Sequence, residues 1–116
     1  MVSVDIKNNN YITNEVLEMM LSPYNFTAEK TVDEEDGLVV LCLDEIEFLI
    51  SWGATEDEAL TEMAKDILGH AEDYYKDFEI WSRGEGKFHM PYMLKALFLN
   101  DVEKIKELIQ CRPGEN

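Results

Sequence analysis

Between residues 26 and 52, the apolar positions form three short runs with the spacing of β-strands. In the first run, 26–32, apolar side chains share one side of the segment with Lys30 as the exception, which suits a sheet with one wet face. The second run, 38–43, is apolar throughout, as expected of a central strand. In the third run, 46–52, the even positions are apolar. The pattern predicts three consecutive strands.

The connections between these runs predict that the strands form an antiparallel meander. The acidic turn 33–36 ends in Gly37, which is free to adopt a positive φ and so favours a hairpin. A weaker alternation at residues 2–6 indicates a fourth, N-terminal strand, which the asparagines at 8–10 would end.

A long helix is predicted directly after the third strand. Gly53 ends the strand, and Thr55 with Glu58 forms a capping box. Apolar residues then recur at spacings of three and four from Leu60 to Phe78, which makes one stripe along the helix. Gly69 interrupts this helix, so we expect either a close packing contact or a bend there.

Shorter helices are predicted on either side of this unit. Thr13 or Asn14 can cap a helix that Pro23 stops, Pro91 suits the first turn of another, and Asn100 is the candidate cap of the last, which runs before a frayed end. The fold class is therefore α+β: a three-stranded antiparallel meander packed by a long helix, with two C-terminal helices. We expect a single domain over 1–116, with a core at 26–81 and a C-terminal helical extension at 88–110.

Charge narrows the classes of partner. Ten Lys and Arg against 25 Asp and Glu give a net charge of −15, of which −12 falls in residues 1–58. Such a field repels phosphate, so no direct nucleic-acid binding is expected, whereas a basic protein partner would be attracted. Solubility alone would explain the charge equally well.

The expected localisation depends on leader-like and membrane-spanning segments in the sequence. No leader-like start and no apolar stretch of about 18 residues is visible, so we expect a cytoplasmic protein that does not enter a membrane. Cys42, within an apolar run, is interpreted as a small buried hydrophobe in a reducing compartment, and Cys111 makes no metal or disulfide spacing with it.

Candidate chemistry is sparse. Asp66, His70 and Asp73 lie at helical spacing and could bind a metal ion, although a solvated polar face is the more common arrangement. The carboxylates at 44–47 could act in acid–base chemistry, but acidic residues are ordinary in turns. No phosphate loop, catalytic triad or paired CxxC is present. We therefore expect no enzyme, no cofactor and no resident metal.

An aromatic cluster ends the long helix. Tyr74, Tyr75, Phe78 and Trp81 can be core residues, but aromatic residues are also enriched at interfaces. The nearly continuous apolar run at 94–99, including Leu97 and Phe98, supports the second interpretation. A homodimer built on these residues is the resulting hypothesis.

The order of three strands, a glycine and a capped helix resembles the HicB-like antitoxin domain. The matching residues are Gly53, Thr55, Glu58, Ala59 and Leu60, and the resemblance covers about residues 26–78. It implies a reduced ribonuclease H-like fold without catalytic residues, which binds a small basic toxin that cleaves messenger RNA. The C-terminal segment carries few basic residues, unlike the DNA-binding segment common in that family.

The sequence therefore predicts a non-enzymatic antitoxin that neutralises a basic toxin ribonuclease. The expected partner-binding residues are acidic and lie in two turns: Asp33, Glu34, Glu35, Asp36, Asp44, Glu45 and Glu47. The alternative is an orphan self-associating module of the same fold with no toxin partner. A metal-dependent hydrolase using Asp66, His70 and Asp73 is a weaker third hypothesis.

Overall fold

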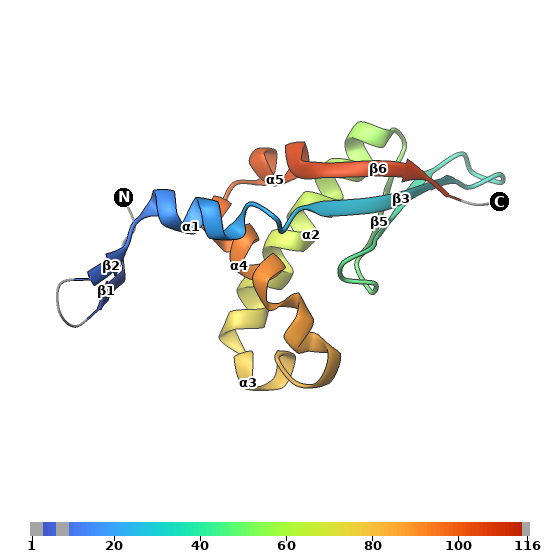
Figure 1. The fold of residues 1–116 in the computed structure, drawn as a ribbon. Helices are drawn as coiled ribbons and strands as arrows, with labels where there is room; N and C mark the ends of the chain where they lie inside the picture. The colour runs from blue at the N-terminus through green and yellow to red at the C-terminus, as the bar shows by residue number, and fades with distance from the viewer. Residues whose placement is uncertain (1–3, 7–9, 115–116) are drawn as a thin grey trace.

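The computed structural model describes residues 4–6 and 10–114, with side chains from residue 13 onward. A four-stranded sheet lies against one long helix, and shorter helices pack beside it (Figure 1). The elements in chain order are β1 (Val4–Ile6), β2 (Asn10–Ile12), α1 (Asn14–Leu21), β3 (Phe26–Val32), β4 (Val39–Leu43), β5 (Ile50–Gly53), α2 (Glu56–Lys76), α3 (Phe78–Trp81), the 3-10 helix η1 (Gly84–His89), α4 (Met90–Leu99), α5 (Val102–Leu108) and β6 (Ile109–Pro113). The predicted α+β class is confirmed.

The predicted meander is present as β3, β4 and β5. Each strand is antiparallel to the next, and the order across the sheet is β5-β4-β3-β6. Gly37 closes the β3–β4 turn with φ of +73°, and its amide donates to the Asp33 carbonyl at 2.8 Å. The glycine is needed because a residue with a side chain rarely adopts that conformation.

The fourth strand of the sheet is C-terminal, so two sequence-based expectations were wrong. β6 pairs in parallel with β3, with Phe26 opposite Ile109. The last helix was expected to include Ile109, and a frayed end was expected to follow it. β1 pairs with β2 in a separate two-stranded sheet, and within the described part of the chain it does not join the four-stranded one. Parallel strands need a long connection, which here runs from β4 through α5. Local sequence patterns carry no information about such distant pairing.

The start of α2 follows the predicted capping chemistry. The Glu58 amide donates to Thr55 Oγ1 at 3.1 Å, and the Glu58 carboxylate accepts from the Ala54 amide at 3.0 Å. A Cβ added to Gly53 would lie 2.7 Å from the Ala59 nitrogen, so glycine is what allows β5 to run so close to the helix. At Gly69 an added Cβ would meet nothing within 4 Å, and α2 continues unbroken through it.

The hydrophobic core lies between the sheet and the helices α2, α4 and α5. Its largest fully buried members are Tyr74, Phe26, Leu41, Leu43, Ile46, Met63, Ile67, Met93 and Ile105. The C-terminal helices thus complete the same core that the sheet begins. None of the helices in the described part of the chain combines the length and hydropathy needed to cross a bilayer.

Two further local predictions concern the shorter helices. Thr13 caps α1 by accepting from the Val16 amide, as expected. The cap of α5 is Asp101, which accepts from the Lys104 amide at 3.0 Å, whereas Asn100 ends α4 in a left-handed conformation. The predicted cap at Asn100 was therefore wrong by one residue. Of the two adjacent polar residues, Asn100 ends α4 and Asp101 begins α5.

The third strand differs from its predicted extent. β5 contains only residues 50–53, and residues 44–49 form a turn in which the Leu43 amide donates to the Leu49 carbonyl at 3.0 Å. Within this turn the side chain of Ile46 is buried in the core, whereas that of Phe48 is 51% exposed. Within β5 it is Ser51 that is buried, at 2% exposure, and the apolar side chains of Ile50 and Trp52 lie outward. A turn therefore interrupts an alternation that the sequence presents as continuous.

Candidate partner-binding surface

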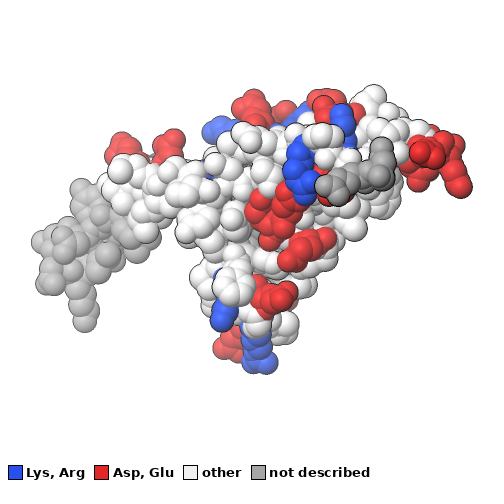
Figure 2. Space-filling model, turned by 45° about the vertical axis from the view of Figure 1, so that its right-hand side comes forward, with Lys and Arg blue, Asp and Glu red and all other residues white. Residues whose placement is uncertain are grey.

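The acidic residues predicted to bind a partner do not form one cluster. Residues 33–36 lie in the turn before β4, and residues 44–47 lie in the turn after it. A five-residue strand separates the two turns by about 17 Å. Acidic side chains crowd the projecting end of the sheet, where the β3–β4 turn lies (Figure 2).

Part of each acidic turn serves the fold. Asp33 Oδ1 accepts from the amides of Glu35 and Asp36, and Asp36 Oδ1 accepts from the Leu38 amide. The side chains of Glu34 and Glu35 are exposed, and no side-chain hydrogen bond or ion pair is recorded for either among the described residues. These two carboxylates are therefore available to a partner.

The second turn is held by two interactions. Arg112 donates to Asp44 from Nε at 3.0 Å and from Nη2 at 2.8 Å, and these bonds hold the pKa of the Asp44 carboxyl below its usual value. Glu45 accepts from the Thr27 amide at 2.8 Å and from the Thr27 hydroxyl. Glu47 is exposed and, within the described part of the chain, has no recorded side-chain bond. It is the free carboxylate of this turn.

The open edge of the sheet carries a cluster of exposed apolar side chains that the sequence analysis did not assign to a surface. Trp52 is 59% exposed and Ile50 is 47% exposed. Phe48, in the preceding turn, is also exposed, but its ring packs against His70 of α2. The residues opposite them on β4, Val40 and Cys42, are half-buried. The alternating apolar residues at 46–52 were the feature of the sequence that could have indicated this surface. The tertiary structure is needed to show which of these side chains face water.

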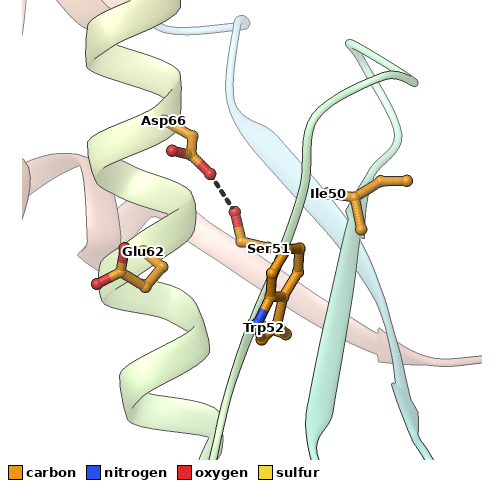
Figure 3. A pocket seen from close by; sticks show the side chains of 5 residues that line it. All are labelled: Ile50, Ser51, Trp52, Glu62 and Asp66. Atoms are coloured by element: carbon orange, nitrogen blue, oxygen red, sulfur yellow. Dashed lines mark hydrogen bonds between the residues drawn. The ribbon is translucent and has the colours of Figure 1, made fainter.

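A groove runs between β5 and α2 beside these residues. Ile50, Ser51, Trp52, Glu62 and Asp66 line it (Figure 3). The Ser51 hydroxyl donates to Asp66 Oδ2 at 2.5 Å, and Glu62 lies one turn earlier on the same helix.

The hollow continues along the edge toward the start of α2. Its lining there consists of Trp52, Gly53, Asp57, Glu58, Thr61 and Glu62. Among the described residues, no Lys or Arg lines either part, although Lys65 approaches Glu62 at 3.5 Å on an exposed surface. The groove is thus acidic on the helix side, and on the strand side it is bordered by Ile50, Ser51, Trp52 and Gly53.

The aromatic residues proposed for self-association are largely used within the chain. Tyr74 is fully buried and its hydroxyl donates to the Gly86 carbonyl at 2.7 Å, and the Tyr75 hydroxyl donates to the Met90 carbonyl at 3.1 Å. Phe78 stacks on Tyr75 at a centroid distance of 5.7 Å and lies in α3 instead of α2. Leu97 and Phe98 are half-buried on α4, whereas Phe78 and Trp81 keep about a third of their surfaces exposed.

His70 lies within this aromatic region and not on a solvated face. It is 8% exposed and contacts the rings of Phe48 and Trp81 at centroid distances of 4.9 and 4.8 Å. No described residue offers a hydrogen-bond partner to its Nε2. Burial, helped by the nearby His89, lowers the pKa of His70, and Asp73 opposes this effect. The neutral form of the ring is therefore favoured.

The hypothetical metal site receives no support from the geometry. Asp66 is bonded to Ser51, and no group of three His, Cys, Asp or Glu suited to a metal ion occurs among the described residues. Cys42 and Cys111 are free thiols on opposite faces of the sheet, and burial raises the pKa of Cys111.

Comparison with known proteins identifies the class. A family model described as an antitoxin of toxin–antitoxin systems, RelE/RelB, matches residues 4–111. A crystal structure described as the antitoxin part of a proposed toxin/antitoxin system from Syntrophomonas wolfei subsp. wolfei is similar at 26% identity. It has a TM-score of 0.79, with 97% of this chain and 82% of that chain covered. No curated protein matches. The predicted antitoxin class is confirmed. The matching family is described as RelE/RelB and not as HicB-like. The chain belongs to this PHD-like family of toxin–antitoxin antitoxins.

Proposed function

We propose that this antitoxin neutralises a basic toxin ribonuclease by binding it, without catalysis and in the cytoplasm. The observation that carries the proposal is the match of an antitoxin family over residues 4–111, in a chain with a net charge of −15. A toxin ribonuclease must bind the phosphates of RNA, so its active surface is basic. An acidic antitoxin can cover such a surface and attract it at long range.

Five of the nine Lys and Arg side chains within residues 13–114 have intrachain ion-pair or hydrogen-bond partners, which favours a protein partner over nucleic acid. Lys30, Lys65, Lys106 and Arg112 form ion pairs with carboxylates, and Lys95 is buried and donates to the Leu21 carbonyl at 3.1 Å. Groups already paired with carboxylates are poorly available to phosphate. Direct nucleic-acid binding is therefore not part of the proposal.

The proposal retains the HicB-like strand and helix unit over residues 26–78. The capping box and the close approach at Gly53 support it, because both belong to the motif that carries the resemblance.

A homodimer is a second element of the proposal. Phe78 and Trp81, with exposed Ile80, are the candidate contacts. Light scattering should then give twice the chain mass, and Ile80→Glu should shift the mass toward a monomer; a wild-type monomer at all concentrations would refute the dimer.

The direct experiment is coexpression with the protein encoded beside this gene. Neutralisation predicts that the neighbouring protein arrests growth alone, that this chain restores growth, and that the two copurify. A neighbouring protein that is neither toxic nor bound would refute the proposal. It would then favour the orphan self-associating module.

The role of the two acidic turns can be measured separately. We expect the triple variant Glu34→Lys, Glu35→Lys, Glu47→Lys to lower the association rate about tenfold at low salt and to flatten its salt dependence. These three carboxylates were chosen because they are exposed and free of internal bonds. The matched control reverses Glu72, Glu79 and Glu107, which are also exposed. Equal rates for the two triple variants would remove the steering role of the turns.

A further inference from the structure

We propose that the open edge of β5 receives an extended strand of the partner, in which basic and apolar side chains alternate. The inference rests on the proposed function, since the strand is taken to belong to the toxin. Its basis is that unpaired backbone groups, exposed apolar side chains and an acidic groove coincide at β5.

Backbone geometry defines the vacant edge. β5 is the last strand of the order β5-β4-β3-β6. The Leu43 amide donates to the Leu49 carbonyl directly opposite it, so in an antiparallel ladder residues 49, 51 and 53 turn their polar groups toward β4. The amide and carbonyl groups of Ile50 and Trp52 then point away from the sheet. An edge of this kind is a template for a further strand.

Side chains on the two faces of this edge differ in chemistry. On the face toward α2, Ser51 and Gly53 are small and leave room beside Glu62 and Asp66. On the opposite face, Ile50 and Trp52 are exposed, and Ile50 points away from α2 in Figure 3. Successive side chains of an added strand alternate between the two faces. One set therefore meets carboxylates and the other meets apolar surface, which an alternating basic and apolar segment satisfies.

Charge excludes a second copy of this chain as the preferred occupant. Two β5 edges paired about a two-fold axis would bring both sets of Glu62 and Asp66 together across the new junction. Like charges facing each other destabilise such an assembly. A basic strand instead gains from the same carboxylates, so the edge discriminates between partners by charge.

The test uses the full chain and a synthetic nonapeptide that alternates valine and arginine. Binding is followed by backbone amide shifts in NMR. We expect the shifts to concentrate at Ile50, Trp52 and Glu62, and the same peptide with glutamate in place of arginine not to bind. An arginine peptide that is N-methylated on the amides facing the edge keeps its charge but loses its donors. It should bind about tenfold more weakly.

The matched variants are Glu62→Lys and Glu72→Lys. Both residues are exposed on α2, about 15 Å apart along the axis, and both changes alter net charge equally. Glu62→Lys should weaken binding of the peptide, and of the neutralised toxin, about fivefold, and Glu72→Lys less than about twofold. Equal effects, shifts located away from β5, an N-methylated peptide that binds as well, or no binding at about 1 mM peptide would overturn the inference. A toxin that binds both variants alike would refute the edge while leaving the antitoxin function intact.

Discussion

The junction between β5 and α2 gives the sharpest test of the structural reasoning, through the substitution Gly53→Ala. The added Cβ would lie 2.7 Å from the Ala59 nitrogen, 2.7 Å from Glu58 Cβ and 3.0 Å from the Glu58 carbonyl carbon. Ordinary contacts between carbon atoms begin near 3.5 Å. The strand or the first turn of α2 must therefore move by about 0.8 Å.

The magnitude follows from what that movement disturbs. Inserting a methyl group into a closely packed site typically costs about 1–3 kcal/mol, and loss of an N-cap costs about 1 kcal/mol. The Thr55 and Glu58 cap lies at this junction, so both effects apply. We expect Gly53→Ala to lower the free energy of unfolding by about 2–3 kcal/mol and Tm by about 10 °C.

Gly69→Ala is the matched control, because the chemical change is the same. Position 69 is exposed in the interior of α2, and its added Cβ would meet nothing within 4 Å. Alanine is a better helix former than glycine, so this variant should be stabilised by about 0.5–1 kcal/mol. Urea denaturation followed by circular dichroism measures both. A Gly53→Ala protein as stable as wild type, or a Gly69→Ala protein that is equally destabilised, would refute the reasoning.

Three further predictions use the same denaturation assay or amide exchange. The pKa of His70 is lowered in the folded state, so below the unfolded value of about 6.5 the unfolded chain takes up a proton that the folded chain does not. The free energy of unfolding should therefore fall as the pH is lowered from about 7.5 to about 5.5, by at most about 1.4 kcal/mol per pH unit. The substitution His70→Phe should reduce this fall. An unchanged pH dependence in the variant would contradict the neutral buried ring. Tyr74→Phe leaves the Gly86 carbonyl without its partner and should cost about 1–1.5 kcal/mol, whereas a neutral result would mean that this hydrogen bond contributes nothing. Asp44→Asn weakens the attachment of Arg112, so amides of β6 should exchange faster while those of β5 do not; uniform exchange would argue against a local role.

These predictions separate stability from recognition. The intramolecular contacts of Gly53, His70 and Tyr74 affect the stability of the fold. The side chain of Trp52 is exposed and contributes little to the hydrophobic core. Substitutions at the open edge should therefore change partner binding more than folding. This division suits a protein whose proposed activity is to present a surface.

The local features of this antitoxin follow from its amino-acid sequence. The β3–β4 hairpin follows from Gly37, the start of α2 from Thr55 and Glu58, and the acidic character from composition. Each depends on neighbouring residues, so each can be derived from spacing and residue type. The antitoxin class was also expected, from the order of these local elements.

The surfaces that those elements present depend on long-range packing, which local patterns do not reveal. β6 pairs with a strand more than 80 residues earlier, and no local pattern encodes that parallel pairing. His70 was placed by spacing on a polar face, but the turn before β5 and α3 bring aromatic rings over it. The same turn changes which side chains of 46–52 face water, because side chains alternate along a strand and a turn resets that alternation. The open apolar edge and its acidic groove exist for that reason.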